Sequence, residues 1–156
     1  MDRLLNQAVK DAPDAILISD REGIIRFWNR GAEQMFGHTA DEAIGQSLDL
    51  IIPENLRGRH WDGYHRVMMS GETKYKTGLL SSPGIRKDGS RISLEFSMAL
   101  LRNEAGQMQG CASIMRDVTE RWKKEKELKE RLNVCETKLA GSSAEAPARW
   151  VELQVK

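Results

Sequence analysis

The residue of this chain with the clearest potential for chemistry is His60, in the stretch IIPENLRGRHWDGYHRVMMSG at residues 51–71. Pro53 and the side chain of Asn55 can start a helix there, and the pattern predicts an irregular helix of about three to four turns. Four further residues fall on or near the face of this helix that holds the imidazole: Leu56, Gly63, Tyr64 and Val67. An imidazole directed into an apolar interior is either a structural histidine bonded to a backbone carbonyl or an axial ligand of iron. The helix alone leaves both open.

Other side chains form no comparable constellation. The serine pairs at 81–82 and 142–143 lie in turn-like or linker sequence, without a His and an Asp at a readable spacing. The glycines are scattered singly and form no phosphate-binding loop. Cys111 and Cys135 show no Cys-x-x-Cys or Cys/His spacing, which predicts two reduced thiols rather than a disulfide or a zinc site. We therefore expect no catalytic residues and no enzymatic activity.

Length and composition limit the kind of protein in which His60 can act. The chain has 156 residues, of which 40% are hydrophobic and 30% charged, and this predicts one compact domain with an extension. A net charge of +1 does not favour nucleic acid or an anionic membrane as a partner. The apolar runs are too short to cross a bilayer and the first residues lack the apolar segment of a signal peptide, so we expect a cytoplasmic protein.

The His60 helix is expected to pack on an antiparallel sheet. The alternation of apolar and polar residues and the turn residues between segments predict strands at residues 14–19, 24–28, 75–80, 91–101 and 108–116. The first two flank a turn at Gly23 and form a hairpin. Short helical segments that end at Gly37 and Gly45 are too short to bury a stripe by themselves and must lie on the sheet. Gly110, Ala112 and Ser113 permit something bulky, a ligand or a helix, to approach the last strand closely.

Two helices and a tail are expected at the ends of the chain. Residues 1–12 have the apolar spacing of a short amphipathic helix, and residues 118–139 form a charged helix with a seam of Leu128, Leu132 and Leu139. These apolar seams predict a homodimer through one helix or both. Residues 140–156 begin as a Gly/Ser/Ala/Pro linker and are expected to form a flexible tail.

Several motifs together resemble a PAS domain, a small sensory module. They are the run DAILISDREGIIRFWNRGAEQMFGHTADEAIG, the turn RKDGSRI and the closing IMRDVTERWKKEKEL, and the likeness covers about residues 10–122. Its specific marks are Asn29 after the second strand, Phe36-Gly37, Lys87-Asp88-Gly89 and the sequence DVTER at 117–121. The resemblance implies an α+β PAS fold at residues 13–117, with a five-stranded antiparallel sheet, short helices on one face and flanking N- and C-terminal helices.

The segment IIPENLRGRHWDGYHR resembles the haem-binding PAS domains of bacterial oxygen-sensor kinases and phosphodiesterases, in which the helical His supplies the proximal bond to iron. From His60 to Asp88-Gly89 the spacing matches the kinases without a gap. The resemblance implies haem b as cofactor, His60 as its metal ligand and Arg66 as a basic residue near it. Two positions depart from the family pattern. Leu80 stands where those kinases carry a distal Arg, and Gly78 where one phosphodiesterase type carries a ligating Met.

These departures leave the sixth iron position unassigned. Leu80, Met98 and Ile114 are expected to form an apolar distal wall that admits a diatomic gas. The implied function is a sensor of O2, CO, NO or redox state that signals through its C-terminal helix to a partner such as a histidine kinase or regulator. The alternative is an interaction or dimerisation module without haem, or with a noncovalent flavin. The flavin photosensors of this fold carry a reactive Cys where this chain has His60, which disfavours covalent flavin chemistry.

Overall fold

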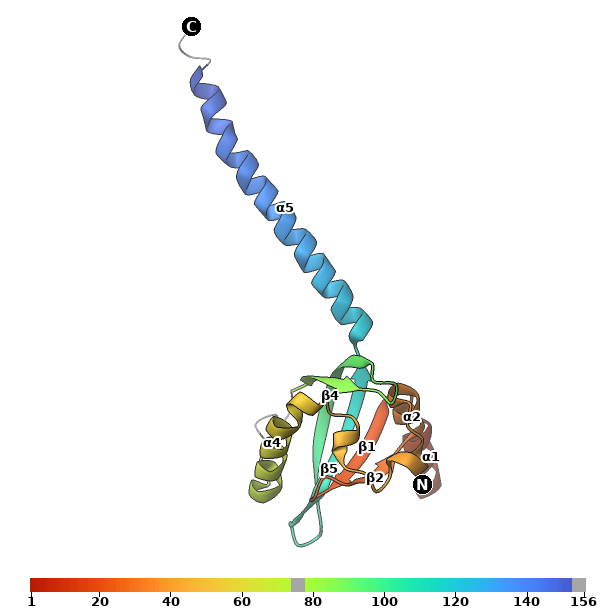
Figure 1. Ribbon diagram of the computed structural model, residues 1–156. Helices are drawn as coiled ribbons and strands as arrows, with labels where there is room; N and C mark the ends of the chain where they lie inside the picture. Colours follow the sequence, from red (N-terminus) through yellow and green to blue (C-terminus); the bar gives the residue numbers. More distant parts are fainter. Residues whose placement is uncertain (74–77, 153–156) are drawn as a thin grey trace. The chain divides into compact units, whose positions relative to one another are not determined.

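The computed structural model describes residues 1–73 and 78–152, with side chains placed up to residue 142. It divides into two compact units, Met1–Val118 and the segment from Thr119 onwards, shown as ribbons in Figure 1. The first unit contains the elements α1 (Asp2–Asp11), β1 (Ala15–Asp20), β2 (Ile25–Trp28), α2 (Arg30–Phe36), α3 (Ala40–Ala43), the 3-10 turns η1 (Leu48–Leu50) and η2 (Glu54–Leu56), α4 (Arg57–Ser70), β3 (Leu80–Ile85), β4 (Arg91–Arg102) and β5 (Met108–Asp117). The second unit is the helix α5 (Thr119–Glu152).

The five strands form one antiparallel sheet in the order β2-β1-β5-β4-β3. The central pairing joins the first strand to the last, with Leu17 opposite Ser113. Because directly opposed residues share a face and successive residues alternate, this register places Leu17, Ser113 and Met98 on one face. Ile114 and its partner Ser97 point to the other face. The α+β fold and the five-stranded antiparallel sheet are as the sequence predicted.

The core lies between this inner face and the segment from α2 to α4. Leu17 and Ile25 from the sheet and Phe36 from α2 are completely or almost completely buried there. Figure 1 shows α2 and α4 as separate helices that flank the middle of the sheet. Met68, Met108 and Cys111 form a second, smaller core beneath the C-terminal half of α4. The short helices thus gain their stability by packing on the sheet rather than from their own length.

Asn29 joins three elements at the entrance to α2. Its side-chain oxygen accepts hydrogen bonds from the Ile16 and Ala32 amides, and so caps α2 and holds β1. Its side-chain nitrogen donates to the carbonyl oxygens of Val9, Ala12 and Asp14. The side chain is 2% exposed, so these bonds satisfy a buried amide that would otherwise be costly.

One strand lies further along the chain than the sequence predicted. Residues 75–77 of the strand expected at 75–80 lie outside the described range, 78 and 79 are not in a strand, and β3 begins at Leu80 and continues to Ile85. The physical reason is its place at the edge of the sheet, because an edge strand tolerates a proline such as Pro83 better than a central strand does. The residues LSSPGI therefore form a strand despite their weak strand propensity.

The C-terminal helix is longer than expected. We predicted a helix at residues 118–139 and a flexible tail at 140–156, but α5 continues to Glu152. The Ala, Glu and Arg residues after position 143 favour a helix, whereas Gly141, the two serines and Pro147 in the same stretch do not. Along α5 the charged side chains form ion pairs within the helix, such as Glu120–Lys123 and Arg121–Glu125.

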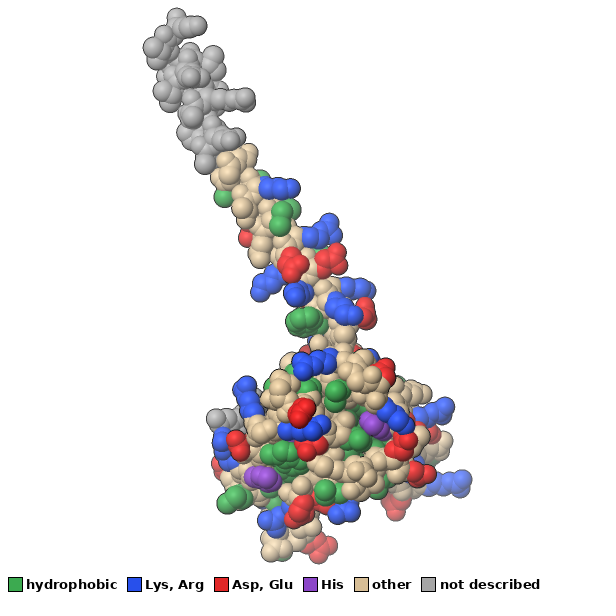
Figure 2. Space-filling model, viewed as in Figure 1, with side chains coloured by type: hydrophobic (Ala, Val, Ile, Leu, Met, Phe, Trp, Pro, Cys, Tyr) green, Lys and Arg blue, Asp and Glu red, His purple; other side chains and the backbone are tan. Residues whose placement is uncertain are grey.

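The surface carries both signs of charge. Figure 2 shows Lys and Arg side chains interspersed with Asp and Glu on the visible face, in keeping with the net charge of +1. Within the described residues, each helix is too short or too polar to cross a membrane.

Candidate functional site

The candidate site is the region beneath α4, the helix that carries His60. A 3-10 turn leads into the helix, and Gly71 ends it in the left-handed conformation with φ of 67°. Only Met68 of this helix is fully buried. Arg57 reaches back from the first turn and donates hydrogen bonds to the carbonyl oxygens of Asp49 and Ile52. At the other end, Arg102 of β4 donates to the Gly71 carbonyl.

His60 is half-buried and one of its ring nitrogens is isolated. The Nδ1 atom is buried and finds no hydrogen-bond partner among the residues that the structure describes. The imidazole centroid lies 5.0 Å from the Trp61 ring and 5.7 Å from the Tyr64 ring. Burial lowers the pKa of His60 below 6.5, more than the nearby charge of Asp49 raises it. The imidazole is therefore neutral at pH 7, and neutral imidazole is the form that binds a metal ion.

Trp61 fills the space beside His60. Its indole nitrogen donates a hydrogen bond of 2.8 Å to the Asp49 carboxylate. The far edge of its ring lies over Gly23 in the β1–β2 turn, where an added Cβ atom would come within 2.3 Å of the indole. Gly23 has φ of 77°, so both the turn and the ring require glycine at this position.

Tyr64 ties the middle of α4 to β1. Its hydroxyl donates to the Asp20 carbonyl oxygen and lies 2.9 Å from the Ser19 hydroxyl. Because a carbonyl can only accept, Ser19 is the donor in the second bond. Burial raises the pKa of Tyr64 to about 12, so the phenol is neutral at physiological pH.

The residues predicted for the site are only partly brought together. Met98 packs against the small core of Met68, Met108 and Cys111, which Tyr64 also contacts. Leu80 lies on the same face of the sheet, opposite Phe96 in the β3–β4 register. Arg66 is on the exposed side of α4.

The structure contradicts the placement of Ile114 in the distal wall. This side chain is 46% exposed and points away from α4, while its neighbour Ser113 is 7% exposed and faces the core. At this point β5 turns a small polar residue inward and a large apolar one outward, although Met115 on the same face as Ser113 is buried as apolar side chains usually are.

Sequence reasoning missed Trp61, Asp49 and Ser19. Trp61 stands next to His60 on the inner side of α4, and its partners come from segments far away in the chain. A signal was available, because the next residue on a helix lies about 100° round the axis, where a large aromatic side chain can cover the flank of an inward histidine.

His60 offers a nitrogen ligand for the iron of a porphyrin, but the side chains around it leave no room for the porphyrin ring. The isolated Nδ1 atom shows that the imidazole of His60 is not used up by structural hydrogen bonds. Trp61 and Tyr64, however, occupy the room between α4 and the sheet. Two surface hollows, one along α1 and one between Phe36 and Lys87, lie away from this room. Among the described residues, Trp61 and Tyr64 would therefore have to move before a large planar group could lie beside His60.

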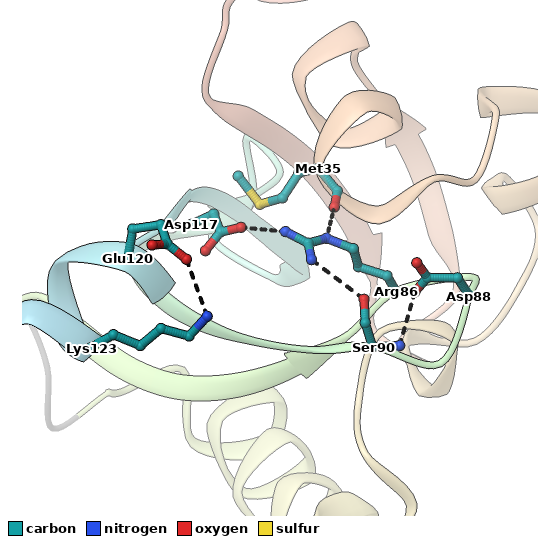
Figure 3. A network of polar contacts seen from close by, with 7 residues as sticks. All are labelled: Met35, Arg86, Asp88, Ser90, Asp117, Glu120 and Lys123. Atoms are coloured by element: carbon teal, nitrogen blue, oxygen red, sulfur yellow. Dashed lines mark hydrogen bonds and ion pairs between the residues drawn. The ribbon is translucent and has the colours of Figure 1, made fainter.

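A second polar centre lies within the first unit, at the end of β5. The guanidinium of Arg86 donates to the Met35 carbonyl at 2.9 Å, to the Ser90 hydroxyl at 3.4 Å and to the Asp117 carboxylate at 2.5 Å. Figure 3 shows the Arg86 side chain extended between these three groups. One side chain thus connects α2, the β3–β4 turn and the last residue of β5.

Comparisons with known proteins match this geometry to one family. The PAS fold family matches residues 9–123 of this chain. The sensor protein FixL of Bradyrhizobium diazoefficiens is 29% identical over 127 residues, which are 81% of this chain and 25% of that protein. The oxygen sensor protein DosP of Escherichia coli is 28% identical over 90 residues, which are 58% of this chain and 11% of that protein.

A solved structure supports the same fold. The crystal structure of the PAS domain of a protein from Colwellia psychrerythraea matches with a TM-score of 0.64 and 24% identity, over 76% of this chain and 97% of that chain. At this identity the likeness shows the fold alone. The chain covers only 11 to 25% of the length of FixL and DosP.

Proposed function

Since the chain belongs to the PAS family of sensory domains, we propose that it senses through a haem b group bound by His60. The observation that carries the proposal is the buried Nδ1 atom of His60, which lacks a hydrogen-bond partner in the described chain. A purely structural histidine would be expected to satisfy its buried ring nitrogen. The similarity to the oxygen sensor protein DosP adds support, as does the lowered pKa that keeps the imidazole neutral.

The residues around His60 define what such a site would favour. When bound, haem would supply an iron that takes O2, CO or NO or changes its oxidation state. Leu80 and Met98 lie on the inner face of the sheet and would offer an apolar wall without a hydrogen-bond donor. Arg66, exposed on α4, would supply a positive charge at the rim of the site. We propose no catalytic activity for this chain itself.

The proposed output passes through Asp117. Arg86 ties this carboxylate to the Met35 carbonyl, so a shift of α2 or of the sheet would reach the end of β5. Because α5 begins two residues later, a small change in strand position would alter the start of the helix. Such a switch requires two arrangements that differ by only a few kcal/mol, since a ligand can bias them no further than its differential affinity.

The proposed partners are a second copy of the chain and a downstream signalling protein such as a histidine kinase or regulator. Leu128, Leu132 and Leu139 of α5 are more than half exposed, which favours a homodimer through this helix. The chain matches only part of longer relatives, which supports an output domain or partner elsewhere. Cys111 and Cys135 are free thiols, which supports a cytoplasmic setting.

An absorption spectrum tests the haem proposal. Protein made with haem available is expected to show a Soret band, and His60→Ala is expected to lose it or shift it to the position of unligated haem. His65→Ala, which changes an exposed histidine of the same helix, is the matched control and is expected to keep the band. Absence of the band in the wild type, or an identical band in His60→Ala, would refute the role of His60.

A specific observation favours a second candidate, an interaction module without a cofactor. Trp61 and Tyr64 fill the space beneath α4 and donate hydrogen bonds to the Asp49 carboxylate and the Asp20 carbonyl there. This candidate predicts the same dimer but a colourless protein. A yellow protein without a Soret band would instead indicate a noncovalent flavin.

A further inference from the structure

The chain's own side chains occupy the place where a ligand of His60 would lie. We infer that Trp61 and Tyr64 hold α4 closed over this site, so that they set its affinity and must withdraw before a ligand can reach His60. The identity of the ligand rests on the proposed function. The closure itself rests only on contacts within the chain.

The Tyr64 hydroxyl is the first closing contact. It satisfies the Asp20 carbonyl by donating to it and the Ser19 hydroxyl by accepting from it. Ser19 is 2% exposed, so its hydroxyl has no access to water while α4 is closed. Removal of the phenol oxygen would leave the buried Ser19 hydroxyl without this partner in the closed form, but hydrated in the open form, while the Asp20 carbonyl would keep its hydrogen bond from the Gly23 amide.

The Trp61 indole is the second closing contact. It rests on the backbone of Gly23 and donates its N–H to Asp49. These two partners lie in the β1–β2 turn and in η1, so the ring is held from two sides by elements outside α4. A methyl group on Gly23 would stand 2.3 Å from two ring carbons, and the ring would have to leave its seat.

These contacts matter because α4 has little else to hold it. Its only fully buried residue is Met68, and its other apolar contacts with the two cores come from the partly buried Trp61, Tyr64 and Val67, so much of its attachment depends on the two closing residues themselves. Arg57 and Arg102 fix the two ends through backbone carbonyls, while Trp61 and Tyr64 hold the middle. Loss of one middle contact should therefore raise the fraction of open molecules without unfolding the sheet.

Opening and affinity are linked quantitatively. A ligand that binds only the open form has an apparent affinity equal to its intrinsic affinity multiplied by the open fraction. Removal of one buried hydrogen-bonding group is expected to raise that fraction, and with it the apparent affinity, by about tenfold. A variant that lacks one closing contact should therefore bind the ligand more tightly than the wild type. A variant that lacks a contact to the ligand would bind it more weakly.

Two variants and a matched control test the closure in haem-free protein. Tyr64→Phe keeps the ring and removes the hydroxyl, and Gly23→Ala displaces the Trp61 ring. Gly89→Ala is the control, because Gly89 has φ of 82°, close to the 77° of Gly23, but no atom within 4 Å of its added methyl group. Amide hydrogen exchange in α4 is expected to be about tenfold faster in both test variants than in the wild type and the control. Unchanged exchange in Tyr64→Phe would overturn the inference, even if Gly23→Ala fails to fold.

Titration with haemin separates this inference from the proposed function. Faster exchange together with about tenfold tighter haemin binding by Tyr64→Phe supports both. Faster exchange without haemin binding by any variant supports the closure and refutes the haem function. Faster exchange with equal or weaker haemin binding would refute the inference, because opening would then not control access to His60.

Discussion

Asn29 shows how far a single residue can be interpreted from sequence. Its position after the second strand was one mark of the family resemblance, and in the structure its side chain caps α2 by accepting a hydrogen bond from the Ala32 amide. Its three bonds to the backbone of residues 9–14 could not be predicted, because they depend on the path by which the chain returns from α1. Local capping follows from residue type, whereas the other partners of a buried amide follow from the tertiary fold.

The error at Ile114 belongs to the same scale. The predicted strand at residues 108–116 is present as β5. The prediction placed Ile114 on the inner face of this strand. In the structure Ser113 and Cys111 are buried, whereas the larger Ile114 faces outward. A shift of one residue exchanges the two faces of a strand, so a predicted strand does not by itself fix which residues line a site.

The buried imidazole of His60 should make stability depend on pH. Its folded-state pKa lies below 6.5, so the unfolded chain takes up a proton first as pH falls. Its contribution is therefore complete above pH 6.5 and is lost as pH falls through the lower, folded-state pKa. Burial also lowers the pKa of His38, which acts in the same direction.

Urea unfolding between about pH 7 and 5 measures this effect. The free energy of unfolding is expected to decrease with pH in the wild type and to decrease less in His60→Gln. Asp20 does not interfere, because its lowered pKa lies below 3.8. Parallel pH profiles of wild type and His60→Gln would contradict the prediction.

At the scale of elements, the sequence predicted what local patterns determine. The β1–β2 hairpin, the alternating strand β4 and the helix around His60 are present in the structure. The edge strand β3 lay beyond prediction because its strand state depends on pairing with β4 rather than on its own residues. The contact of Trp61 with Gly23 could not be predicted either, because it joins segments that are remote in sequence.

Arg86 is predicted to hold α2, the β3–β4 turn and the end of β5 in one arrangement. Arg86→Lys keeps the charge, but a single ammonium group cannot replace three separately directed donors. We expect the free energy of unfolding to fall by about 1–2 kcal/mol, measured by urea denaturation. Lys87→Ala is the neighbouring control, and because the Lys87–Glu42 pair is exposed it should cause no measurable change. Equal stability of Arg86→Lys and the wild type would show that the connection does not hold the elements together.

At the scale of the whole molecule, α5 is predicted to mediate a homodimer. Leu128 and Leu132 are 61% and 57% exposed, and they recur at the spacing of a helix–helix seam. The double variant Leu128→Glu/Leu132→Glu is expected to be monomeric in multi-angle light scattering at concentrations where the wild type is dimeric. Val134→Glu is the control, since Val134 is also exposed, at 54%, but lies off the seam. A wild-type monomer at high micromolar concentration, or a dimer that survives the double variant, would exclude this interface.

The pairing of β1 with β5 has a consequence for how the domain forms during synthesis. Ala15 lies opposite Met115, so the centre of the sheet cannot be completed until nearly the last residue of the first unit has left the ribosome. Until then β1 has β2 as its neighbour and an open edge on its other side. Such long-range pairing slows folding and leaves the nascent chain open to pairing with other chains. The newly made polypeptide therefore remains vulnerable to aggregation until β5 closes the sheet.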